Sequence, residues 1–179
     1  NFQASLRAFC DGAHRLPDAI QQVNRSIVRT VSPGTVITMF YGEIDPARGT
    51  LRYTNAGHNF PLLRRADGTL VGLQEGGLPL GILETSRYSD EVISIAPEDA
   101  LLLFSDGITE ALDAANEQFG DERLEEAWRR HGASPPHEFI ERLLAEVVAF
   151  RDGAIQSDDM TLVVIGAGGI FGPLVPRIV

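Results

Sequence analysis

Apolar residues recur every three or four positions in several segments of the chain, which predicts helices. Residues 16–31 show this spacing with Pro17 in the first turn, and residues 121–130 and 136–150 repeat it. The end of a further helix is expected over residues 2–10. Each of these helices has one apolar face, so we expect them to cover a sheet.

Short β-forming runs separated by turn residues fill the rest of the chain. The turn residues at Asp45–Gly49 and at Asp67-Gly68 predict two hairpins. The almost unbroken apolar run at 36–41 is typical of an interior strand. The expected strands are residues 36–41, 51–55, 61–65, 70–73, 88–95, 101–104 and 160–165.

The order of these elements indicates the fold class. Helices, antiparallel hairpins and late helices followed by a strand predict an α+β fold, with mostly antiparallel sheets packed as a sandwich and flanked by helices. A parallel, doubly wound sheet is disfavoured. With 179 residues, 44% of them hydrophobic, the chain has the size of one domain. We expect that domain over residues 1–166, followed by a tail over residues 167–179.

Charge and cysteine content narrow the class of partner and the compartment. There are 15 Lys and Arg residues against 25 Asp and Glu, which gives a formal net charge of -10 and makes nucleic acid and anionic membranes poor partners. No apolar run approaches the roughly 18 residues of a membrane span, and residues 1–12 do not resemble a signal peptide. The single cysteine, Cys10, favours a buried thiol in a reduced compartment, so we expect a cytoplasmic protein.

Carboxylates stand at the ends of two of the expected strands. Asp106 follows the strand at 101–104, and Asp158 and Asp159 precede the strand at 160–165. If these strands are antiparallel neighbours, the carboxylates meet at one end of the sheet, and a cation keeps them ionised. Oxygen ligands favour Mg²⁺ or Mn²⁺. The alternative is that each aspartate caps an adjacent turn.

Four short motifs occur in order along the chain, and together they are far more specific than any one alone. They are Tyr53-Thr54-Asn55-Ala56-Gly57-His58-Asn59, Leu78-Pro79-Leu80-Gly81, Phe104-Ser105-Asp106-Gly107-Ile108-Thr109-Glu110-Ala111 and Asp158-Asp159-Met160-Thr161. This set resembles the SpoIIE-type branch of the metal-dependent protein phosphatase (PPM) family. The resemblance runs from Phe2 to about Ile165.

The resemblance implies a phosphatase that uses two Mn²⁺ or Mg²⁺ ions to activate water against a phosphoserine or phosphothreonine. Asp106 and Asp158 match metal-ligand aspartates of the family and would carry catalysis. Asp159 matches a position that supports the ligands without binding the metal, and Gly107 would let the backbone turn close to the metals.

The resemblance leaves the roles of other motif residues open. Asn55, Gly57 and His58 form a family signature, in which His58 either polarises a phosphate oxygen or is a structural histidine that bridges strand ends. Glu110 either supports a metal ligand or starts a helix, where the helix dipole favours a carboxylate.

The chain departs from the family pattern at its start. The family's first metal-binding aspartate lies in a strand and glycine-rich turn before the helix expected at 2–10, and no such motif is present. A chain without it is expected to lose most metal affinity and nearly all catalysis. Asp11-Gly12-Ala13-His14 is interpreted as a helix-ending turn. Leu174-Val175-Pro176-Arg177 is similar to a protease-cleavage tag, so we expect part of the tail to be foreign.

The resemblance also implies partners. The usual substrate in the family is a phosphorylated STAS-type anti-sigma-factor antagonist, whose dephosphorylation changes sigma-factor availability in bacterial partner switching. A sensory or receiver domain upstream is typical. Two alternatives remain open: a catalytically inactive phosphatase-like binding domain, and a hydrolase of small phosphate esters. The sequence determines neither the input signal nor the oligomeric state.

Overall fold

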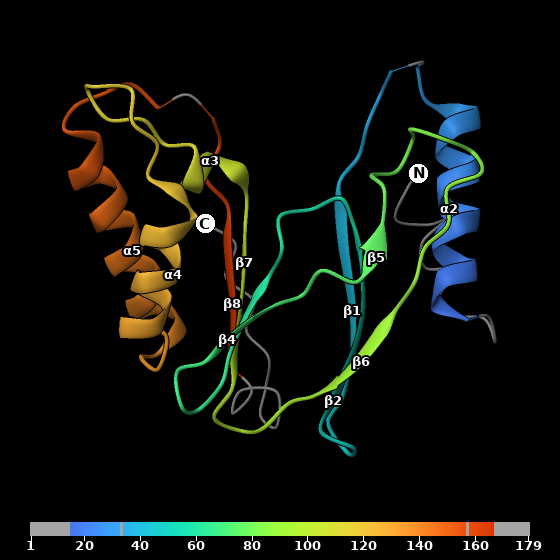
Figure 1. The fold of residues 1–179 in the computed structure, drawn as a ribbon, viewed down its shortest axis with the longest axis horizontal. Helices are drawn as coiled ribbons and strands as arrows, with labels where there is room; N and C mark the ends of the chain where they lie inside the picture. The colour runs from blue at the N-terminus through green and yellow to red at the C-terminus, as the bar shows by residue number, and fades with distance from the viewer. Residues whose placement is uncertain (1–14, 33, 157, 167–179) are drawn as a thin grey trace. The chain divides into compact units, whose positions relative to one another are not determined.

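The chain divides into two compact units, each built around its own sheet. The computed structural model describes residues 15–32, 34–156 and 158–166. The first unit combines residues up to His58 with Gln74–Ser94, and the second combines Asn59–Leu73 with the residues from Ile95 onward. The helices and strands of both are labelled in Figure 1.

The first unit contains one described helix and a four-stranded sheet. Its elements are α2 (Leu16–Thr30), β1 (Met39–Asp45), β2 (Thr50–Ala56), β5 (Gly76–Gly77) and β6 (Glu91–Ser94). Strand β2 pairs antiparallel with β1 and with β6, and forms a two-residue parallel ladder with β5. The β1–β2 turn closes where Asp45 Oδ1 accepts the N–H groups of Ala47 and Arg48, both at 3.0 Å. The helix and the hairpin predicted from the sequence are therefore confirmed.

Helix α2 packs its apolar face on the first sheet. Leu16, Ile20, Val23 and Ile27 are buried and cluster with Ala56, Leu80 and Tyr88. The one polar residue buried within this face, Asn24, bonds the segment after Leu80 through both atoms of its amide group. Its amide donates to the Leu83 carbonyl at 2.7 Å and accepts the Gly81 N–H at 2.9 Å. An amide on an otherwise apolar face thus fixes the helix to this segment.

Strand β1 differs from the interior strand expected at 36–41. It begins at Met39, runs on to Asp45 and, within the described residues, pairs with β2 alone. Ile37 contributes only an isolated bridge to Leu80. The apolar run at 36–41 correctly indicated a strand but not where the strand begins and ends. Residues of this run are half-buried or exposed, so they do not lie in the interior as their apolar character suggests.

The second unit has a purely antiparallel sheet in the order β4-β3-β7-β8. Its strands are β3 (Leu62–Arg64), β4 (Leu70–Gly72), β7 (Ala100–Phe104) and β8 (Leu162–Gly166). Its helices are α3 (Asp106–Thr109), α4 (Gly120–His131) and α5 (Pro136–Arg151). Helices α4 and α5 lie together beside this sheet (Figure 1), and their buried residues form one cluster with those of β3, β7 and β8.

Trp128 of α4 lies at the centre of this second core. Its side chain is fully buried, its indole N–H donates to the Leu62 carbonyl at 3.1 Å, and its ring meets that of Phe139 edge to face at 4.5 Å. A buried tryptophan needs a partner for its N–H. The Trp128 indole N–H finds this partner in a carbonyl of β3, and the side chain thereby joins α4, α5 and β3.

The predicted α+β class with antiparallel sheets is confirmed. So are the second hairpin and the helices expected at 121–130 and 136–150, within one residue at most ends. The sequence did not predict α3 or β5. The expectations for residues 2–10, Cys10, residues 11–14 and the tail at 167–179 fall outside the described residues. Among the described helices, none is both long and apolar enough to cross a lipid bilayer.

Candidate functional site

The pairing of β7 with β8 brings two of the sequence motifs to one end of the second sheet. Phe104, the last residue of β7, pairs with Leu162, the first residue of β8, in an antiparallel ladder. Asp106 follows β7, and Asp158 and Asp159 precede β8, so the three carboxylates leave the sheet at the same end. Figure 1 shows α3, which begins with Asp106, at this end of both strands. The antiparallel arrangement that the carboxylate hypothesis required is present.

Ser105 fastens the two segments beyond the end of the ladder. Its N–H donates to the Thr161 carbonyl at 3.0 Å, and its hydroxyl accepts the Thr161 N–H at 2.9 Å. The same hydroxyl donates to the Asp159 carbonyl at 2.9 Å. No role of its own was predicted for Ser105. A serine directly before an aspartate at a strand end is the signal that was available.

Gly107 allows the main chain of the second motif to pass close to the first. A β-carbon at this position would lie 2.3 Å from the Asp159 carbonyl oxygen and 2.9 Å from its carbon. Real β-carbons do not approach a main chain so closely. Only glycine fits here without moving one of the two segments.

The carboxylates at this end of the sheet are exposed and without ion pairs. Asp106, Asp158, Asp159 and Glu110 are all exposed, and none of them forms a salt bridge with a described residue. Asp106 Oδ1 accepts the Gly107 N–H at 3.0 Å, and Asp158 Oδ1 accepts the Asp159 N–H at 2.7 Å. Asp106 and Asp158 therefore each cap their own turn with one carboxylate oxygen, and no described residue bonds the other oxygen.

The acidic donors do not form a complete metal cluster by themselves. No group of three or more His, Cys, Asp or Glu within 15–32, 34–156 and 158–166 is placed to hold a metal ion. Oxygen donors of this kind suit a hard divalent cation, and Asp106 and Asp158 supply two of them.

Of the two roles left open for Glu110, the start of a helix is wrong. Glu110 is the C-terminal cap of α3, and its N–H donates to the Asp106 carbonyl at 2.8 Å. The helix begins four residues earlier, at Asp106, directly after the apolar strand. A four-residue helix containing glycine gives no periodic signal, so the sequence does not show at which end of the helix Glu110 lies.

The first unit carries the motif that contains Asn55, Gly57 and His58, which forms a closed turn at the end of β2. Asn55 is buried, accepts the His58 N–H on Oδ1 at 2.7 Å and donates from Nδ2 to the His58 carbonyl at 2.9 Å. Gly57 has φ +72°, and a β-carbon there would lie 2.2 Å from Pro79 of the Leu78–Gly81 motif. Two of the family-like motifs therefore fit against each other inside this unit. Asn55 and Gly57 therefore stabilise the conformation of this turn.

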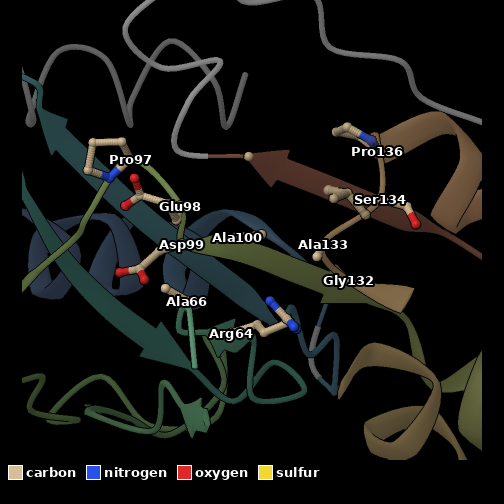
Figure 2. A pocket seen from close by; sticks show the side chains of 12 residues that line it. Arg64, Ala66, Pro97, Glu98, Asp99, Ala100, Gly132, Ala133, Ser134 and Pro136 are labelled. Carbon is tan, nitrogen blue, oxygen red and sulfur yellow. The ribbon is translucent and has the colours of Figure 1, made fainter. Parts of the chain in front are cut away.

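A separate cavity of about 420 Å³ lies in the second unit, at the end of β7 away from Asp106. Figure 2 shows its lining residues, which come from β3 and the turn after it, from β7 and the loop before it, from the connection between α4 and α5, and from β8. Two of its charged groups are engaged: Asp99 pairs with Arg65 at 2.7 Å, and the Arg64 guanidinium donates to the main-chain carbonyls of Arg129 and Arg65. The third, Glu98, is exposed. None of the motif aspartates lines it.

Comparison with known proteins assigns this architecture to a family. The model of the family described as Stage II sporulation protein E (SpoIIE) matches residues 2–167. Protein IcfG of Synechocystis is 31% identical over 72% of the chain, and the phosphoserine phosphatase RsbU of Bacillus subtilis is 27% identical over 82%. The chain spans 20% and 43% of the lengths of these relatives.

Solved structures share the fold at lower sequence identity. The SiaA-PP2C domain of Pseudomonas aeruginosa superposes with a TM-score of 0.79 at 20% identity, covering 92% of this chain and 67% of that one. The catalytic domain of the serine/threonine phosphatase PstP, solved with two manganese ions, gives 0.63 at 18% identity, covering 91% of this chain and 77% of that one.

Proposed function

The chain belongs to the SpoIIE family, which has the fold of PP2C-type phosphatase domains, and from this premise we propose that it is the catalytic domain of a protein phosphatase. Its reaction would be metal-dependent hydrolysis of phosphoserine or phosphothreonine. The observation that carries the proposal is the arrangement of Asp106 and Asp158 at one end of the β7–β8 ladder. We take the domain to extend over residues 1–166, in keeping with the family match.

The residues at this end of the sheet fit a divalent cation. Asp106 and Asp158 offer exposed carboxylate oxygens with no arginine near enough to neutralise them among the described residues. Such oxygens prefer Mn²⁺ or Mg²⁺, and manganese is the metal in the PstP structure. A bound ion of this kind lowers the pKa of water and stabilises charge on a phosphoryl oxygen.

The chain's own residues would hold these donors in place. Ser105 fixes the Asp159 carbonyl and the Thr161 N–H, so Asp158 cannot move away from Asp106 without breaking these bonds. Gly107 leaves room for the Asp159 main chain. We assign Asp159 and Glu110 to supporting the site through charge rather than to binding the ion. Positioned donors of this kind lower the cost of organising the transition state.

Asn55, Gly57 and His58 shape a turn in the first unit. The two Asn55–His58 hydrogen bonds and the tight approach of Gly57 to Pro79 support a structural role for the first two residues. For His58 both roles stay open, polarising a phosphate oxygen or bridging strand ends. A His58→Gln variant that retains phosphate release would favour the structural role.

The proposed substrate is a phosphorylated STAS-type anti-sigma-factor antagonist. The support is the relationship to RsbU, a phosphoserine phosphatase, together with the family match. Release of its phosphate would act in bacterial partner switching, which is cytoplasmic, with a sensory or receiver domain of the same protein supplying the input.

The test is Mn²⁺-dependent phosphate release from a serine-phosphorylated antagonist by the full-length gene product that contains this chain. We expect Asp106→Asn to lower the rate at least 100-fold while the protein stays folded. Asp121→Asn, an exposed aspartate in the first turn of α4, is the matched control and should retain the rate. A folded, Mn²⁺-supplied protein that releases no phosphate would contradict the proposal and favour an inactive binding domain. Equal activity on a small ester and on the phosphoprotein would favour the small-ester hydrolase.

A further inference from the structure

Ile155 is the most exposed large hydrophobic side chain among the described residues. It is 91% accessible, whereas the next, Val148 on α5, is 62% accessible. Ile155 lies in the loop that joins α5 to β8, three positions before Asp158. A single exposed apolar residue is common on protein surfaces and by itself means little. Two further observations distinguish this one.

The loop holds Ile155 in place from both sides. On one side, the Arg151 guanidinium donates to the Ala154 carbonyl at 2.5 Å, and the Ala154 N–H donates back to the Arg151 carbonyl at 2.8 Å. On the other side, the Gln156 amide donates to the Asp158 carbonyl at 2.8 Å. The isoleucine is therefore presented outward by a braced turn. Ordering it on binding costs little, since its neighbours are already fixed.

The length of the chain limits how far Ile155 can lie from the candidate site. Three residues of extended chain span at most about 11 Å, so Ile155 lies within roughly that distance of Asp158. An extended substrate places a residue two or three positions from its phosphoserine about 7–11 Å from the phosphate-bearing residue. Such a residue can contact Ile155 while the phosphate lies at the aspartates.

The charges of the loop disfavour one kind of flanking side chain in the substrate. Asp152, Asp158 and Asp159 are exposed and acidic, and the only basic residue of the loop end, Arg151, is engaged with Ala154. An acidic neighbour of the phosphoserine would be repelled here. An apolar side chain would instead bury the exposed surface of Ile155.

We propose that Ile155 is a specificity residue that binds an apolar side chain two or three positions from the phosphoserine of the protein substrate. This inference rests on the proposed phosphatase function. Ile155 has no part in the chemistry: it selects which phosphoserine is bound, by contact with the flanking sequence.

The test compares two phosphoserine peptides that differ only in carrying leucine or serine at these flanking positions. The full-length protein with Mn²⁺ should favour the leucine peptide about tenfold in kcat/KM, through KM. Ile155→Ser should remove this preference and change hydrolysis of p-nitrophenyl phosphate by less than twofold. Val148→Ser, the matched exposed control on α5, should keep the preference.

Equal use of both peptides by the unaltered protein would overturn the inference while leaving the phosphatase function intact. An equal loss on peptides and on the small ester would also overturn it, because Ile155 would then be structural. If no substrate is hydrolysed, the phosphatase proposal fails. Calorimetric binding of the two peptides then still decides whether Ile155 selects the leucine peptide. A preference for the leucine peptide that Ile155→Ser abolishes supports the proposed contact with Ile155. The absence of this preference in the unaltered protein refutes it.

Discussion

Ser105 and Thr161 exchange two hydrogen bonds beyond the last pair of the β7–β8 ladder. The Ser105 N–H donates to the Thr161 carbonyl, and the Thr161 N–H donates to the Ser105 hydroxyl. The ladder is thus extended by a side chain past the point where the strands end. This extension keeps the segments that carry Asp106 and Asp158 together.

Ser105→Ala should affect the segments that carry Asp106 and Asp158 more than the stability of the whole protein. The change removes the bonds of the hydroxyl to Asp159 and Thr161, which costs about 1–2 kcal/mol of unfolding free energy. Mn²⁺ affinity should fall about 10-fold to 100-fold, as is usual when a group that orients metal ligands is lost. Urea denaturation and calorimetric titration with Mn²⁺ measure the two effects. Ser89→Ala, which loses one bond to Gly76 in the first unit, should leave Mn²⁺ affinity unchanged. Equal losses of affinity in both variants would contradict this role of Ser105.

Gly107→Ala should be more damaging than its size suggests. The added methyl group would lie 2.3 Å from the Asp159 carbonyl oxygen, so one segment must shift. Overpacking against a main chain costs about 1–3 kcal/mol, and the displaced Asp158 should weaken Mn²⁺ binding. Gly166→Ala serves as the control, since a β-carbon there would meet nothing within 4 Å. A Gly107→Ala protein with unchanged stability and Mn²⁺ affinity would show that the close approach is unimportant.

Tyr53 should make the stability of the protein depend on alkaline pH. Burial, and then its 2.5 Å hydrogen bond to Glu91, raise the pKa of the Tyr53 hydroxyl to about 12 from the ordinary 10.0. Because the folded-state pKa is raised, the stabilisation is complete below pH 10 and is lost as the pH rises towards 12. The loss amounts to about 2–3 kcal/mol over this range.

The chain is well suited to this measurement because all 15 of its basic residues are arginines, so no lysine titrates in the same range. Unfolding by urea, followed from pH 9 upward, should show a decline that Tyr53→Phe reduces; Tyr88, whose pKa is also raised by burial, should contribute the remainder. Tyrosinate absorbance should show one tyrosine fewer titrating late in the variant. The same decline in both proteins would locate the effect in another group.

The sequence predicted those parts of the fold that have a strong local pattern. The spacing of Leu16, Ile20, Val23 and Ile27 was enough for α2, and the apolar run of β7 was enough for a buried strand. Strand β5 consists of two glycines, which have no strand preference, and it forms only because β2 lies beside it. Its pairing depends on contacts between distant segments that no local pattern records.

The candidate site was predictable to a similar degree. Asp106 and Asp158 could be named because each adjoins an apolar strand, and their meeting followed once β7 and β8 paired. The role of Ser105 could not be predicted, because its hydroxyl bonds residues 54 and 56 positions away. The place of Glu110 at the C-terminal end of α3 could not be predicted, because this helix is too short to give a period.

The most direct test of the central claim is a crystal structure of the full-length protein soaked in Mn²⁺, with the metal located by its anomalous scattering. The account predicts a manganese peak about 2.1 Å from a carboxylate oxygen of Asp106 and of Asp158, lost in Asp106→Asn crystals. A fully soaked crystal whose manganese peaks all lie away from these two carboxylates would contradict the assignment of the metal site to the end of the β7–β8 ladder.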